Sequence, residues 1–135
     1  MIEAKHRIED ALEAVRSAQD EGIVIGGGVA LLKASQGIAV TTENADQAIG
    51  ASIVQRACQA PFRQMAINSG QSPDLLINVV LSDTEGRGWD FRNGVLTDHI
   101  KAGILDPVKV TRTALQNAAS CAGTLITTNY GIVQT

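Results

Sequence analysis

Residues 1–37 read MIEAKHRIEDALEAVRSAQDEGIVIGGGVALLKASQG, and this stretch decides how the chain begins to fold. Apolar residues recur there at helical spacing between charged ones, which predicts an amphipathic helix from about Glu3 to Gln19. The apolar positions are Ile8, Leu12 and Val15. Gly22 provides a stop, and the glycines at 26–28 then lead into VALLKAS. The stretch therefore predicts two helices joined by a flexible glycine run, with the second helix ending near Gly37.

The middle of the chain carries two further helical patterns and one interruption. Residues 41–70, TTENADQAIGASIVQRACQAPFRQMAINSG, form a long apolar segment that Pro61 should kink or divide. Ser72 and Pro73 suit the start of another helix. Its inner stripe is expected to hold Leu75, Leu76, Val79 and Val80. Residues 83–93, DTEGRGWDFRN, predict a loop with a short β-hairpin, the only strand region that we expect.

The last part of the chain predicts a short helix near residues 97–102 and a long final helix that begins at Asp106-Pro107. The buried side of the final helix is expected to hold Val108, Leu115, Ala119, Ala122 and Ile126. Hydrophobic residues make up 44% of the sequence but aromatic residues only 3%, so we expect a core of Ala, Val, Ile and Leu. Such a core favours close-packed helices, and the fold class is predicted to be mainly α.

Composition also bears on partners and location. The formal charge is −3 and no Lys/Arg cluster stands out, so nucleic acid is not an expected partner. Cys58 and Cys121 are widely spaced in apolar surroundings, which predicts buried free thiols in a reducing compartment. The apolar run from Ile23 to Leu32 is too short for a membrane helix, and the charged N-terminus is unlike a signal peptide. We therefore expect a soluble protein of the cytoplasm or of an organelle matrix, without a membrane partner.

Local pattern alone leaves the chemistry open. Asp10 faces away from the apolar stripe of its helix, which fits a solvated polar face or a catalytic carboxylate. The glycines at 26–28 would let backbone N–H groups approach a phosphate, or they serve a close helix crossing or a hinge. Asp106 is explained as a helix cap. His6 and His99 stand alone in the sequence, so no metal site is predicted.

Several uncommon strings occur in one characteristic order. They are RIEDALEAVRSAQDEGIVIGGGVALL, NADQ, APFRQMAINSG, GWD and GILDPVKVTRTALQNAAS. In this order they resemble the GroEL-type (group I) chaperonins over essentially all 135 residues. Members of that family are ATP-driven folding machines, in which rings of subunits enclose non-native proteins. Each subunit has equatorial, intermediate and apical domains.

The resemblance implies a fold and a domain assignment. The chain would be a mainly α, multi-helix fragment of the equatorial domain, with one short β-hairpin. Residues 1–22 would be the last helix of the intermediate domain, and residues 23–135 the C-terminal half of the ATP-binding equatorial domain. The glycine run would then be the hinge between these domains.

The resemblance also implies a set of site residues. Asp10 matches the family's carboxylate that acts on the attacking water once the hinge closes over ATP, and this movement would bring an exposed Asp within reach. Gly27, with Gly26 beside it, matches a backbone contact to the nucleotide. A second group matches the contacts to adenine and to the nucleoside. It consists of Asp90, Phe91 and Arg92 for adenine, and Asp106 for the nucleoside.

The sequence departs from the family pattern in important places. It contains neither the Asp-Gly-Thr-Thr-Thr phosphate loop with its Mg²⁺-binding carboxylate nor an apical domain. Phe91 and Arg92 stand where small residues are common. The resemblance implies ATP and Mg²⁺ as cofactors, but phosphoryl transfer depends on charge neutralisation at the phosphates. We therefore expect the chain by itself to be inactive as an ATPase.

Two functional hypotheses of different classes follow. In the first, the chain is part of a chaperonin subunit and acts with complementary chain, other subunits or copies of itself, while non-native clients bind only the complete machine. In the second, it is a stand-alone helical interaction module without ATPase activity. Residues 44–68 are apolar widely around the helix, so an exposed apolar patch and hence a partner or self-association are expected.

Overall fold

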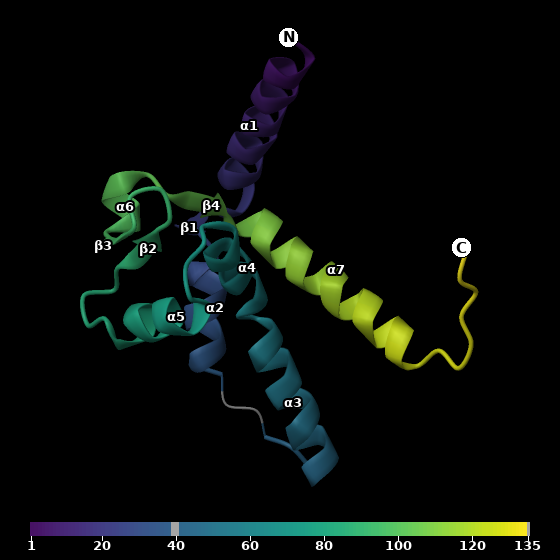
Figure 1. Ribbon diagram of the computed structural model, residues 1–135. Coiled ribbons are helices and arrows are strands. Elements are labelled where there is room, and N and C mark those ends of the chain that lie inside the picture. The colour runs from purple at the N-terminus through teal and green to yellow at the C-terminus, as the bar shows by residue number, and fades with distance from the viewer. Residues whose placement is uncertain (39–40, 135) are drawn as a thin grey trace. The chain divides into compact units, whose positions relative to one another are not determined.

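The computed structural model describes residues 1–38 and 41–134, and most of these residues are helical (Figure 1). The helices are α1 (Ile2–Glu21), α2 (Val29–Gln36), α3 (Ala45–Ala57), α4 (Ala60–Asn68), α5 (Pro73–Ser82), α6 (His99–Ala102) and α7 (Val108–Ile126). The strands are β1 (Ile23–Ile25), β2 (Gly88–Asp90), β3 (Val95–Thr97) and β4 (Leu105–Pro107). The predicted mainly α fold class is confirmed.

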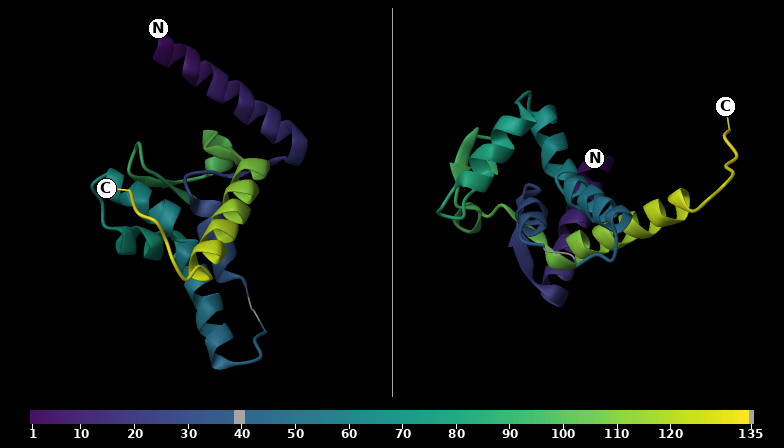
Figure 2. Two further views of the ribbon diagram at one scale, coloured as in Figure 1. Left: turned by 90° about the vertical axis from the view of Figure 1, so that its right-hand side faces the viewer. Right: turned by 90° about the horizontal axis from the view of Figure 1, so that it is seen from below.

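The chain divides into two compact units. One contains α1 and α7, and the other runs from Ile23 to Asp106. This division is a property of the structure, whereas the assignment of residues 1–22 and 23–135 to intermediate and equatorial domains stays a prediction. Figure 2 gives two further views of the elements within each unit.

In the first unit, polar contacts join the end of α1 to the start of α7. The N–H of Val108 donates to the carbonyl of Gly22 at 3.0 Å. Lys109 contacts Asp20 at 2.8 Å. Arg112 donates through Nε and Nη2 to the two carboxylate oxygens of Glu21, both at 2.8 Å. These contacts fix the turn in which Gly22 adopts a φ of 90°.

The prediction of a buried side on the final helix is wrong. No residue of α7 is buried, and Leu115 and Ile126 are 40% and 81% exposed. The apolar stripe of α1, from Ile8 to Val15, is exposed too. A two-helix unit encloses little volume. Both helices therefore carry an apolar face, but the unit has no core in which that face could be buried. Cys121 lies on α7 and is exposed for the same reason, whereas Cys58 is buried as predicted.

The second unit has a hydrophobic core formed by three helices. Its buried members come from α2, α4 and α5, and they are Val29, Leu32, Phe62, Ala66, Leu76, Ile77 and Val80. Phe62 is fully buried at the centre, with the ring of Phe91 at a centroid distance of 5.2 Å. The core is therefore not purely aliphatic, contrary to the expectation from composition. On α5 the predicted residues Leu76 and Val80 are buried, but Leu75 is exposed and Ile77 takes its place.

Pro61 divides the long apolar segment as predicted. α3 ends at Ala57 and α4 begins at Ala60, with Pro61 in the first turn of α4. Proline is tolerated there because the first N–H groups of a helix have no intrahelical acceptor. α4 and α5 then pack against each other, as Figures 1 and 2 show. This pairing places Phe62 against α2.

Two small sheets complete the second unit. β2 and β3 form an antiparallel hairpin in which Gly88 pairs with Thr97 and Asp90 with Val95. This confirms the predicted hairpin, although its second strand lies beyond residues 83–93. β1 and β4 form another two-stranded sheet that we did not expect. A three-residue strand is too short to show an alternating pattern, so the sequence carried no signal for it.

Asp106 is not the cap of the final helix. It lies inside β4, and Pro107 occupies the N-cap position without a side-chain hydrogen bond. The extended backbone of residues 105–107 pairs with β1, and this tertiary pairing overrides the local cap preference of an Asp-Pro sequence. The side chain of Asp106 is thereby released from a structural role in α7.

Replacing Gly28 by alanine should destabilise the second unit by roughly 2 kcal/mol. Gly28 has a φ of +76°, and a Cβ there would lie 3.0 Å from the backbone N of Phe62. Chemical denaturation measures the change. Gly50→Ala is the matched control, because Gly50 lies within α3 with nothing within 4 Å of its added Cβ. That control should be neutral or slightly stabilising; equal effects at both positions would contradict the close approach of Gly28 to α4.

Candidate functional site

The glycine turn between β1 and α2 is held closely on both sides. Gly26 donates its N–H to the carbonyl of Ile104 at 2.8 Å, and an added Cβ would meet that oxygen at 3.1 Å. Gly28 approaches Phe62 in the same way. Close packing, one of the two interpretations of the glycine run, therefore explains Gly26 and Gly28.

Gly27 differs from its neighbours because it is not crowded. Its nearest contact to an added Cβ would be Cε1 of His99 at 3.4 Å, but its φ of +69° is one that other residues rarely adopt. Among the described residues, the N–H groups of Gly27 and Gly28 donate to no backbone carbonyl. The turn thus presents two backbone donors at the start of α2, where the helix dipole favours negative charge.

Asp90 closes the turn after β2. Its Oδ1 accepts hydrogen bonds from the N–H of Arg92 at 2.9 Å and of Asn93 at 3.2 Å, and its Oδ2 accepts one from Nδ2 of Asn93 at 2.8 Å. The side chain of Asn93, followed by these backbone donors, holds the pKa of Asp90 below its ordinary value. Asp90 is only 8% exposed. Its carboxylate therefore shapes the 90–94 turn and has little capacity left for a ligand.

Phe91 and Arg92 have different surroundings. The half-buried ring of Phe91 packs on Phe62 with an interplanar angle of 55°, which ties the turn to the hydrophobic core. Arg92 is exposed and makes no ion pair with a described residue. Of these two, only Arg92 has a side chain that remains available on the surface.

His99 connects the glycine turn, β2 and β4, although it looked isolated in the sequence. Its side chain is buried, and its Nε2 lies 3.1 Å from the carbonyl oxygen of Trp89. Its own carbonyl accepts a hydrogen bond from Ile104 at 2.9 Å. The carbonyl of Ile104 in turn accepts the N–H of Gly26. Three segments that are distant in sequence are joined through this one residue.

The two remaining predicted carboxylates lie in different units. Asp106 is half-buried in β4, and no described residue donates a hydrogen bond to its carboxylate. Asp10 is exposed on α1, likewise without a hydrogen bond from a described residue. The structure therefore gathers the elements that carry Gly26, Gly27, Asp90 and Asp106 in one unit. Asp10 belongs to the other.

The described residues provide no ready-made metal site, since no three His, Cys, Asp or Glu side chains among them are grouped to hold an ion. Within residues 1–38 and 41–134, no helix is both long and apolar enough to span a bilayer.

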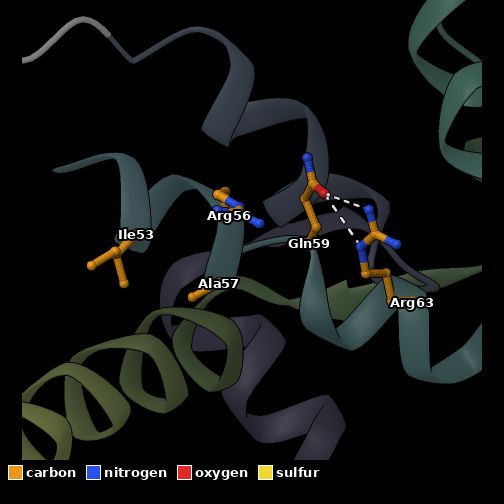
Figure 3. Close-up of a pocket in the computed structure, with 5 residues that line it drawn as sticks. All are labelled: Ile53, Arg56, Ala57, Gln59 and Arg63. Atoms are coloured by element: carbon orange, nitrogen blue, oxygen red, sulfur yellow. Dashed lines mark hydrogen bonds between the residues drawn. The ribbon is translucent and has the colours of Figure 1, made fainter. Parts of the chain in front are cut away.

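A surface pocket of about 520 Å³ lies where α3 meets α4 (Figure 3). Its lining residues are Ile53, Arg56, Ala57, Gln59 and Arg63. Oε1 of Gln59 accepts hydrogen bonds from Nε and Nη2 of Arg63 at 3.4 and 3.2 Å, as the dashed lines show. None of the residues predicted for the site lines this pocket.

Acidification should destabilise the 90–94 turn. The pKa of Asp90 is lower in the folded chain than in the unfolded chain, so its contribution to stability is complete above the unfolded value and is lost as the pH falls through the lower folded value. Asp90→Asn should flatten the loss of thermal stability below about pH 4. Glu43→Gln, at an exposed site of the same unit, should leave that loss unchanged. Identical profiles for Asp90→Asn and the wild type would contradict the hydrogen bonding of Asp90.

Comparison with known proteins places these features in a family. The TCP-1/cpn60 chaperonin family model matches residues 1–135. A crystal structure of a group III chaperonin in the open state is similar, with a TM-score of 0.73 and 27% sequence identity, over 86% of this chain and 25% of that one. The chain thus spans about a quarter of the length of that chaperonin. Because the family model matches its whole length, the chain belongs to the TCP-1/cpn60 chaperonin family.

Proposed function

We propose that this chain forms part of the nucleotide site of an ATP-dependent protein-folding chaperonin subunit of the GroEL type. The observation that carries the proposal is the glycine turn. The N–H groups of Gly27 and Gly28 donate to no backbone carbonyl of a described residue, and they lie beside β4, which bears Asp106, and close to β2, which bears Asp90. The family membership of the whole chain supports the same proposal.

Each residue of the site would have a distinct role. The N–H groups at Gly27 and Gly28 would donate to phosphate oxygens, assisted by the dipole of α2. The carboxylate of Asp106 would accept hydrogen bonds from hydroxyl groups of the nucleoside. Asp90 would keep the 90–94 turn in the shape that contacts adenine, with Phe91 anchoring this turn in the core.

ATP and Mg²⁺ are the proposed cofactors. Bound Mg²⁺ neutralises charge on the phosphates during phosphoryl transfer. Because the described residues offer no group of metal ligands, further ligands would come from complementary chain. Asp10 would act as the general base that orients and deprotonates the attacking water. The partners would be other chaperonin subunits or further copies of this chain, in the cytoplasm, with non-native clients bound by the complete assembly.

The single tryptophan, Trp89, gives a direct test of nucleotide binding. Its emission should change saturably when adenosine, ADP or ATP is added to the full chain. Asp106→Asn should weaken the affinity about tenfold, since the acceptor loses its charge and one of its two oxygens is replaced by a donor. Asp98→Asn is the control. Asp98 caps α6, and asparagine caps a helix as well as aspartate does, so this variant should bind like the wild type. No saturable change with any of the three ligands would refute the proposal.

One observation bears on the choice between this proposal and the second candidate, a stand-alone helical interaction module. α3 exposes Ile49, Ile53 and Val54, each more than half accessible. Patches of this kind usually lie in interfaces. Light scattering with and without Mg²⁺-ATP separates the two candidates. A ring-sized particle would mean that the chain assembles by itself and supports the module, whereas a monomer, small oligomer or aggregate that ignores ATP supports an incomplete part of a chaperonin subunit.

A further inference from the structure

The structure assigns one more residue to this site: we propose that His99 is a positioning residue that holds the glycine turn and the β2–β3 hairpin in register with each other. The inference rests on the proposed function, because its consequence is the affinity of the site for nucleotide. The side chain of His99 is only 1% exposed, and it contacts both the glycine turn and β2.

The hydrogen bond of His99 identifies the ring nitrogen that carries a hydrogen. Nε2 lies 3.1 Å from the carbonyl oxygen of Trp89. A carbonyl oxygen only accepts hydrogen bonds, so Nε2 carries the proton and a neutral ring leaves a lone pair on Nδ1. The residue that follows Trp89 is Asp90, whose carboxylate orders the 90–94 turn. The imidazole thus anchors the last strand residues before that turn.

The ring also packs against glycine backbone on two elements. A Cβ added to Gly88 would lie 2.5 to 2.8 Å from three ring atoms, Cε1, Nε2 and Nδ1, so the ring occupies the space that a side chain there would need. A Cβ added to Gly27 would lie 3.4 Å from Cε1. The imidazole therefore lies directly against the backbone of both β2 and the glycine turn.

Backbone hydrogen bonds extend the connection to β4. The carbonyl of His99 accepts the N–H of Ile104 at 2.9 Å, and the carbonyl of Ile104 accepts the N–H of Gly26 at 2.8 Å. Asp98 fixes the start of α6 by accepting from Ile100 and Lys101. A displacement of His99 would therefore reach the glycine turn by two routes, through its ring and through Ile104.

The second ring nitrogen shows that His99 is not a simple space-filling residue. Nδ1 is buried without a hydrogen-bond partner among the described residues. An unpaired buried polar atom destabilises a protein, and an apolar side chain of similar size would fill this position without that penalty. The advantage of histidine here is the donor at Nε2, which an apolar side chain cannot supply.

Two variants of the full chain test the donor. Glutamine places its amide nitrogen the same number of bonds from Cα as Nε2, so His99→Gln retains a donor, whereas His99→Met keeps the length and removes it. ADP binding is measured by the change in Trp89 emission. We expect His99→Met to weaken the affinity for ADP about five- to tenfold, the factor that one net hydrogen bond contributes. His99→Gln should bind ADP with an affinity within about twofold of the wild type. His6→Gln, at the other, exposed histidine, should match the wild type.

Two readouts that need no nucleotide make the outcome decisive. Imidazole ¹⁵N NMR should show the Nε2–H tautomer, and amide hydrogen exchange at residues 26–29 should accelerate in His99→Met but not in His99→Gln. An Nδ1–H tautomer, or unchanged exchange and affinity in His99→Met, would overturn the inference. If the wild type binds no nucleotide, the proposed function fails, and the exchange and NMR data still decide whether His99 holds the turn.

Discussion

Replacing Phe62 by alanine is expected to lower the free energy of unfolding of the second unit by about 3–5 kcal/mol. Phe62 is fully buried, and its ring packs with that of Phe91 at the centre of the core. Its backbone is also the surface against which Gly28 is closely fitted. The variant leaves a cavity where α2, α4 and the 90–94 turn meet. A small domain is stable by only about 5–15 kcal/mol, so the loss is large.

The control for Phe62→Ala is a substitution at an exposed apolar residue of the same helix. Ile67 is also on α4 but is more than half exposed, so Ile67→Ala should cost less than about 1 kcal/mol. Urea denaturation, followed by Trp89 emission and by circular dichroism, gives both values. If Phe62→Ala were as mild as Ile67→Ala, the core described for the second unit would be wrong.

If the proposed function is right, replacing Asp10 by asparagine should lower ATP hydrolysis by the proposed chaperonin assembly about 10²- to 10⁴-fold, the range that a general base contributes. Asparagine has nearly the same shape but cannot take a proton from water. The affinity for ATP should remain unchanged, because the proposed nucleotide contacts lie on other residues. Asp10 is exposed and unbonded to described residues, so the fold should not change.

Glu9→Gln separates a specific base from a general charge effect. Glu9 precedes Asp10 on α1 and is exposed as well, so this variant removes the same charge from the same helix. Its hydrolysis rate should match the wild type. Equal rates for Asp10→Asn and the wild type, or an equal fall in both variants, would exclude Asp10 as the base.

Elements with a strong local signal could be predicted from the sequence. The amphipathic pattern gave α1, Pro61 divided α3 from α4, and Ser72-Pro73 marked the start of α5. β1 and β4 could not be predicted because their pairing is tertiary and each has three residues. For the same reason the local sequence around Asp106 predicts a helix cap instead of a strand. The exposure of α7 was missed because periodicity states which face is apolar and not whether a partner covers it.

The candidate site was predictable only in part. The positions of Gly26, Gly27 and Asp106 were expected from resemblance, and their roles in nucleotide binding stay predictions. The structural role of the Asp90 carboxylate does have a local signal, because an Asp that lies two and three residues before the N–H groups it accepts from is typical of a turn. His99 has no local sequence signal for its role, because its contacts with Gly27, Gly88 and Trp89 arise only from the tertiary fold.

The proposed nucleotide site consists of the glycine turn, the 90–94 turn and β4. Hydrogen–deuterium exchange of the full chain with and without Mg²⁺-ATP tests it most directly. We expect slower exchange at residues 26–29, 90–94 and 105–106 when the nucleotide is present. Unchanged exchange in all three segments, or protection confined to the pocket at residues 53–63, would contradict it.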